Sequence, residues 1–180
     1  MPVEFFHKMK GTTQSPPRVS LREILLSWMG SFLGIAAVAS MNSHVLEGSD
    51  LIMIIGSFGA SAVLIYGAIK SPLAQPRNLM GGHVLSAFIG VACYKLLPEA
   101  PWLAAALAVS TAIAAMHATK TLHPPGGATA LIAVIGTDQI HALGFLYVLI
   151  PAGAGAAIML VVALIFNNLP SSRRYPEFWL

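Results

Sequence analysis

Residues 123–136 read HPPGGATALIAVIG, a start rich in helix-breaking residues followed by a short apolar run. Proline and glycine disfavour the middle of a helix. Proline is nevertheless favoured in the first turn, because its missing N–H would have no partner there. The stretch therefore predicts a short helix that begins at its prolines and is too short for a comfortable membrane span.

The composition of the whole chain indicates a membrane protein. Of the 180 residues, 56% are hydrophobic and 9% are charged, and the mean hydropathy is +0.75. Soluble domains carry about 25% charged residues. The single cysteine, Cys93, excludes a disulfide framework. The formal net charge of +3 comes from residues that flank apolar segments, so it indicates membrane orientation and not nucleic-acid binding.

Six apolar segments predict an all-α, polytopic helix bundle. Each segment should be helical, because a helix satisfies its own backbone in lipid. A spanning helix needs roughly 17–25 residues. The first, second and last segments have this length, whereas the fifth is a half-helix or a re-entrant piece. The segments are 24–43, 51–69, 83–97, 101–117, 124–136 and 142–166.

The distribution of basic residues supports six crossings with both termini in the cytoplasm. In that arrangement nine Lys and Arg residues are cytoplasmic and only Lys95 is external, as the positive-inside rule requires. We expect a cytoplasmic tail over residues 1–22, a membrane domain over 23–167 and a second cytoplasmic tail over 168–180. The expected location is the bacterial inner membrane, with a plastid envelope as the alternative.

The two halves of the chain resemble each other. Residues 59–64 (GASAVL) match 127–132 (GATALI), and residues 83–86 (HVLS) match 141–144 (HALG) in the same order. This pattern predicts two inverted three-helix repeats, in which transporters place their site at the repeat interface between broken helices. Shared composition is the alternative explanation.

The helix start at residues 123–129 is a candidate anion site. The N-terminus of a helix offers free N–H groups and a partial positive charge. Gly126 and Gly127 let a ligand approach the backbone closely, and Thr129 and His123 add side-chain donors. The alternative for the two glycines is tight helix packing.

The stretch GSFGAS at residues 56–61 would be the counterpart in the first half. Ser57 and Ser61 are four residues apart and share a helix face, with Gly59 between them. The two hydroxyls would line a polar path. The alternative is that they bond to carbonyls of their own helix.

One further stretch, together with Lys120, could form a cytoplasmic mouth. Residues 71–83 contain two prolines and two glycines and predict a structured turn. Arg77, Asn78, His83 and Lys120 could line the transport pathway or its mouth, where Arg77 and Lys120 would attract anions. Arg77 could instead set the topology or bind lipid phosphate, and His83 could be an interfacial residue at a helix start.

The sequence gives no sign of a metal site, a cofactor or an enzyme. The six histidines form no H-x-x-x-H pair, and Asp and Glu are confined to tails and loops. A cation transporter would place carboxylates in the membrane, and no nucleophile motif is present. The expected partners are a small inorganic anion, membrane lipid and further copies of the chain in a homo-oligomer.

Three stretches resemble the HPP family of small integral membrane proteins. They are HPPGGATAL, GSFGASAVLIYG and SPLAQPRNLMGGH, and the resemblance covers residues 24–166. It implies a membrane domain often described with four spanning helices, which conflicts with the six segments above. It also implies a link to nitrite transport, known for relatives in plastids and cyanobacteria.

Together these observations predict transport of a small inorganic anion, with nitrite as the first candidate and nitrate as the second. The anion would bind at the two half-helix starts, at residues 57–61 and 124–129. Two alternatives remain open: a membrane scaffold that transports nothing, and a channel for a neutral small solute.

Overall fold

The structure, a computed structural model, describes residues 2–180 and the side chains from residue 4 onward. The described part of the chain is helical and contains no strand, which confirms the all-α prediction. Its α-helices are α1 (Pro2–Lys8), α2 (Leu21–His44), α3 (Ser57–Ala62), α4 (Pro76–Leu96), α5 (Pro101–Ala118), α6 (Pro124–Ile135), α7 (Asp138–Leu143) and α8 (Ala154–Phe166). Three further helical pieces are η1 (Val63–Gly67), η2 (Pro72–Ala74) and η3 (Val148–Gly153).

Four of the described helices are long and apolar enough to cross a membrane. They are α2, α4, α5 and the helix over Val148–Phe166. Two shorter apolar helices cover Ser57–Gly67 and Pro124–Ile135. The prediction of a short helix at the HPPGG stretch is confirmed, since α6 has 12 residues and begins at its first proline. Six complete crossings are not confirmed.

The second apolar segment differs from the prediction of a full span over 51–69. Residues 51–55 form no helix, and α3 begins only at Ser57. The Met53 N–H donates to Oδ1 of Asn42 at 2.8 Å, and the side chains of Met53 and Ile55 are buried in the core. These tertiary contacts hold the segment in a non-helical form that its apolar composition did not indicate.

Two other boundaries also differ from the prediction. Helix α4 begins at Pro76 and not after the glycine pair, because proline occupies its first turn and the glycines lie inside the helix. The last predicted segment, 142–166, is interrupted. Ile150 is non-helical (φ −133°, ψ 119°), as expected for the residue before a proline.

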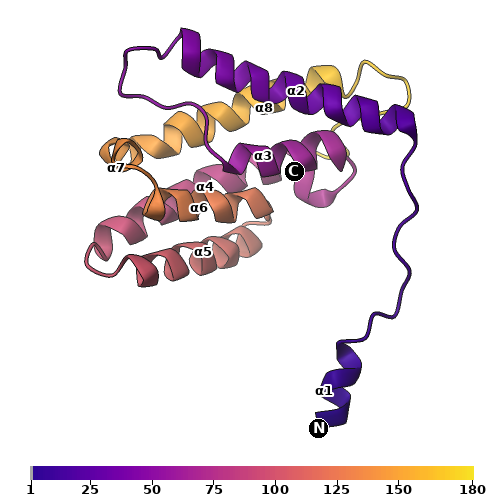
Figure 1. Cartoon of the computed structure of the whole chain (residues 1–180), viewed down its shortest axis with the longest axis horizontal. Coiled ribbons are helices and arrows are strands. Elements are labelled where there is room, and N and C mark those ends of the chain that lie inside the picture. Colours follow the sequence, from indigo (N-terminus) through magenta and orange to yellow (C-terminus); the bar gives the residue numbers. More distant parts are fainter. Residues whose placement is uncertain (1) are drawn as a thin grey trace.

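Helix α4 is the centre of the bundle. It packs against α5, α6 and η3, whereas α2 packs along α8 and η1 (Figure 1). Small residues permit the close contacts: Ala104, Ala108 and Ala112 form a buried stripe on α5 at four-residue spacing. At Gly90 of α4, a Cβ atom would lie 2.5 Å from the Ala130 carbonyl oxygen of α6.

The first and last residues of the membrane domain lie at the same end of the helix bundle. Arg173, near the C-terminus, forms an ion pair with Glu23 in the first turn of α2, with 2.5 Å between Nη2 and Oε1. The Tyr175 hydroxyl donates to the Ala74 carbonyl at 2.7 Å, and burial raises the pKa of this phenol. The start of α2 and the end of α8 therefore lie at the same end of the bundle (Figure 1).

Candidate functional site

Five polar side chains meet in the interior of the bundle. Each is at most 1% exposed. They come from the short helix α3, from α4, and from α6 with the residue before it. The five are Ser57, Ser61, His83, His123 and Thr129, and we call them the polar network.

Ser61 is the centre of the polar network. Its Oγ lies 2.7 Å from Nε2 of His83 and 2.9 Å from Nε2 of His123. The two imidazole rings are 5.2 Å apart, centroid to centroid, and meet edge to face. One hydroxyl therefore bridges two histidines.

Thr129 connects α6 to the two neighbouring helices α4 and α3. Its Oγ1 lies 2.7 Å from Nδ1 of His83 and donates to Oγ of Ser57 at 2.8 Å. It also lies within 3.2 Å of the Pro125 carbonyl oxygen, one helical turn back. The Ser57 hydroxyl therefore contacts another helix, which differs from the alternative of a bond within its own helix.

His123 is positioned by the chain around it. Its backbone is extended (φ −140°, ψ 104°), as a following proline favours, so the ring leaves the axis of α6. Nδ1 of this ring lies 2.8 Å from the Leu73 carbonyl oxygen. Gly82 makes room for it, because a Cβ atom there would lie 2.5 Å from Cβ of His123.

The polar network contains donors but no acid, lysine or arginine. Hydroxyls and imidazoles can each donate and accept, so the arrangement can bind a small anion or carry protons. Among residues 2–180, no group of three or more His, Cys, Asp or Glu side chains could hold a metal ion.

The predicted glycines lie outside the polar network. Gly59 is exposed on the far face of α3. Gly126 packs against α4, where a Cβ atom would lie 2.7 Å from the Gly82 carbonyl oxygen. Gly127 borders an apolar groove of about 550 Å³ between α5 and α6, into which His117 also faces.

The start of α6 offers few backbone donors. Prolines 124 and 125 have no N–H, and the Gly126 N–H donates to the His123 carbonyl at 2.8 Å. The donors brought together at this site are therefore side chains. Anion binding by the backbone at this helix start stays a prediction.

Three predicted mouth residues, Arg77, Asn78 and Lys120, lie at the end of the bundle where Arg173 pairs with Glu23. We call this the basic end. Asn78 is buried, and its amide donates to the Leu122 carbonyl at 2.8 Å, while Arg77 is half-buried and Lys120 is exposed. Oδ1 of Asn78 and Nε of Arg77 are buried without a hydrogen-bond partner in the described part of the chain.

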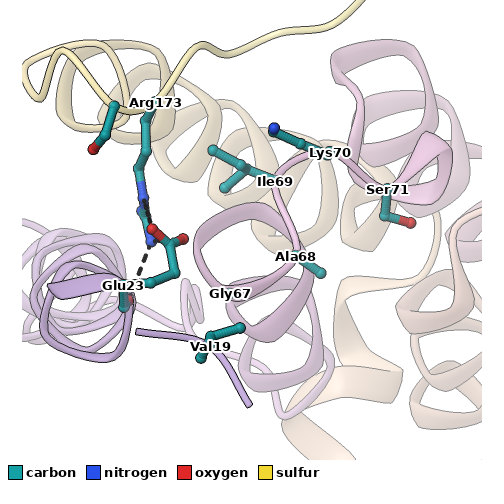
Figure 2. A pocket seen from close by; sticks show the side chains of 9 residues that line it. Val19, Glu23, Gly67, Ala68, Ile69, Lys70, Ser71 and Arg173 are labelled. Atoms are coloured by element: carbon teal, nitrogen blue, oxygen red, sulfur yellow. Dashed lines mark hydrogen bonds and ion pairs between the residues drawn. The ribbon is translucent and has the colours of Figure 1, made fainter. Parts of the chain in front are cut away.

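A cavity of about 410 Å³ opens at the same end (Figure 2). Figure 2 shows Lys70 and Ser71 on one side of it and the Glu23–Arg173 pair on the other. Because Glu23 neutralises Arg173, Lys70 is the lining cation that has no ion-pair partner among the described residues.

The sequence predicts His83 in the transport pathway or at its mouth, and the structure places it in the polar network. The signal that could have located it is Pro76, which starts α4 two turns earlier and so carries His83 inward. His141, the residue matched to His83, stacks on Tyr94 with ring centroids 4.0 Å apart and stays outside the polar network. The inverted repeat is not confirmed, although the matched residues Ser61 and Thr129 both belong to the network.

Comparison with known proteins gives a family. Residues 16–176 match the HPP transmembrane region. Two proteins of Dictyostelium discoideum, both named only as transmembrane proteins, are 49% and 44% identical over 98% of this chain. This chain spans 58% and 64% of their lengths. No solved structure matches it.

Because both relatives come from Dictyostelium discoideum, they do not support the predicted location in a bacterial inner membrane. Their names give no substrate. The family match covers most of the chain, includes every residue of the polar network and agrees with the four long apolar helices. The chain belongs to the HPP transmembrane family.

Proposed function

We propose that this chain transports a small inorganic anion across a membrane, with nitrite as the first candidate and nitrate as the second. The observation that carries the proposal is the polar network itself. Five hydroxyl and imidazole side chains are buried among membrane helices, where polar groups are costly and mark transport pathways.

The chemistry of the network suits a transient anion. Hydroxyl and imidazole N–H groups donate to an anion without the strong attraction of a buried lysine or arginine, so the anion can also leave. The two short helices over Ser57–Gly67 and Pro124–Ile135 resemble the broken helices that form transporter sites.

The basic end would guide the anion to this site. Lys70, Arg77 and Lys120 lie at that end, and a positive field raises the local concentration of anions. By the positive-inside rule this end faces the cytoplasm. Its cavity, between Lys70 and the Glu23–Arg173 pair (Figure 2), would be the access route.

The test is anion flux into proteoliposomes that contain the purified protein. We expect nitrite uptake above that of empty vesicles and at least a tenfold loss for Ser61→Ala. Ser86→Ala is the matched control, because Ser86 is an equally buried serine of α4 whose hydroxyl contacts Met116 and not the network. If nitrite, nitrate and similar anions all fail to move, the proposal is wrong.

A channel for a neutral solute is the second candidate. It is favoured by the uncharged side chains of the polar network. The two functions differ in their response to voltage: uptake of an anion without a co-transported cation changes with membrane potential, and uptake of a neutral solute does not.

A further inference from the structure

The segment before α2 lies outside the helix bundle. We call residues 2–20 the N-terminal arm; it consists of α1 and a non-helical stretch over residues 9–20. Every side chain from Glu4 to Ser20 is exposed. Figure 1 shows the arm leaving the start of α2 across the direction of the long helices, with α1 at its far end. Because the long helices run through the membrane, the arm runs along the plane of the membrane surface.

Helix α1 has one apolar face. Successive residues of a helix are about 100° apart, so Phe5, Phe6 and Met9 lie on the same side. The Met9 N–H donates to the Phe6 carbonyl at 3.2 Å, which extends the helical turn as far as Met9. These three side chains are 59%, 62% and 65% exposed. The polar residues of the helix lie on the opposite side, and they are Glu4, His7 and Lys8. The apolar face is therefore left uncovered by residues 4–180.

The arm and the first turn of α2 carry a net positive charge. Between residues 4 and 22, four exposed basic side chains stand against one acid, Glu4. The four are Lys8, Lys10, Arg18 and Arg22. The ion pair found among residues 4–180 joins Glu23 to Arg173, so none of these four charges is neutralised within the described part of the chain.

An apolar face beside free cations matches the chemistry of an anionic lipid surface. The apolar side chains of such a helix enter the boundary between headgroups and acyl chains, while its basic residues attract the negative charge of the lipids. Clusters of four or more Lys and Arg directly beside a membrane-spanning helix, on its cytoplasmic side, are typical of binding to anionic lipids.

The membrane surface is also within reach of α1. Residues 9–20 separate α1 from Leu21, and twelve residues at no more than about 3.6 Å each span at most about 43 Å. Helix α2 starts at the basic end, where the Glu23 N–H donates to Oγ of Ser20 at 3.2 Å. By the positive-inside rule this end faces the cytoplasm. A lipid surface is thus present beside the arm wherever the bundle is embedded in a membrane.

We propose that the N-terminal arm binds the anionic lipid surface of the cytoplasmic leaflet. Phe5, Phe6 and Met9 insert at the level of the headgroups, and the four basic side chains contact lipid phosphates and carboxylates. Each basic residue near such a surface strengthens binding about fivefold. The inference goes beyond the proposed function and does not depend on it, because the arm contains no residue of the polar network.

The test places a fluorophore on the arm of the full chain. In a Cys93→Ala background, Thr12→Cys introduces one thiol at an exposed position. The labelled protein is reconstituted into vesicles whose lipids carry a quencher on the headgroup. One set contains phosphatidylcholine alone, and the other contains phosphatidylserine as well, in both leaflets. We expect at least twofold stronger quenching with phosphatidylserine, and its loss at high salt, because salt screens charges at an exposed surface.

Variants of the arm separate its two features. Phe5→Ser combined with Phe6→Ser should reduce quenching at least twofold in both sets of vesicles. Glutamine at the four basic positions should remove the difference between the two sets. The matched control is Thr13→Ser combined with Gln14→Ser, at exposed and uncharged positions of the same arm, which should change neither. Because all these positions lie outside the bundle, each variant should unfold at the wild-type denaturant concentration.

Two results would overturn the proposal. Equal quenching in both sets of vesicles that ignores salt would overturn the recognition of anionic lipid. Absence of quenching in both would overturn membrane binding, and cross-linking from the same Thr12→Cys thiol would then show whether the arm contacts the bundle or a second copy of the chain. Neither readout involves flux, so a protein that moves no anion would contradict the proposed function and leave the lipid-binding arm standing.

Discussion

At the scale of single residues, the effect of a substitution in the polar network depends on how many hydrogen-bond partners the replaced side chain has. Thr129 serves His83 and Ser57 at once, and Ser61 serves two histidines. All five side chains of the network are buried, so the loss of one partner leaves a polar atom unsatisfied. The polar network is therefore more sensitive to the loss of one hydroxyl than the small size of that group suggests.

Thr129→Val tests this sensitivity. Valine keeps the shape of threonine but leaves Nδ1 of His83 and the Ser57 hydroxyl without their partner, and one unsatisfied buried group costs about 1–3 kcal/mol. We expect a loss of stability of that size in an unfolding titration and at least a tenfold loss of flux. Thr111→Val, at an exposed position of α5, should change neither. Wild-type flux in the Thr129 variant would contradict a role of the network in transport.

At the scale of helices, the close contact between α4 and α6 depends on glycines. Gly126 lies against the Gly82 carbonyl and the Ser86 hydroxyl, whereas the next residue, Gly127, faces the apolar groove. The sequence allowed both glycines to be either ligand contacts or packing positions. Their surroundings separate them: Gly126 is a packing position, and Gly127 has open space beside it.

Alanine at these two adjacent positions should have opposite effects. In Gly126→Ala the new Cβ would lie 2.7 Å from the Gly82 oxygen and 2.8 Å from Oγ of Ser86, and overpacking of this kind costs about 1–3 kcal/mol. In Gly127→Ala the nearest atom is Cγ1 of Val109 at 3.9 Å, and alanine favours the helix by up to about 1 kcal/mol. Unfolding titrations of both variants provide the measurement.

Flux through the Gly127 variant then decides its role. A well-folded Gly127→Ala protein with wild-type flux would remove Gly127 from the anion site. A folded protein with lost flux would support close approach of the anion to its backbone.

At the scale of the whole molecule, charge distinguishes the two ends of the bundle. Hydrogen bonds join residues 74–78, 122 and 173–177 to one another and to Glu23, and these segments carry or adjoin Lys70, Arg77, Lys120, Arg173 and Arg174. Lys95 lies at the opposite end, beside Gly144. This separation of basic residues is the basis for placing the first end in the cytoplasm.

Cysteine labelling checks that orientation. In a Cys93→Ala background, Lys70→Cys, Lys120→Cys and Lys95→Cys introduce single thiols at exposed positions. A membrane-impermeant maleimide added to intact cells or sealed organelles should label only position 95 on the side opposite the cytoplasm. After permeabilisation all three should react. Labelling of position 70 or 120 before permeabilisation would reverse the proposed orientation.

Much of this protein was determined by the sequence alone. Composition indicated helices in a membrane, since lipid requires backbone groups to be satisfied within each segment. The HPPGG start indicated the short helix α6, because proline is favoured in the first turn of a helix. Four of the five residues of the polar network were predicted at a substrate site from small and hydroxyl-bearing residues at two such starts. His83 was predicted in the transport pathway or at its mouth.

Only the tertiary structure decided how those residues meet. Contacts that are distant in the chain hold residues 51–55 out of a helix, and the start of α4 at Pro76 carries His83 to the centre. The meeting of two Nε2 atoms at one Ser61 hydroxyl joins residues 22 and 62 positions apart. No local sequence pattern predicts this contact. Helical periodicity predicts which side chains share one face of a helix, but only tertiary packing decides which other helix that face contacts.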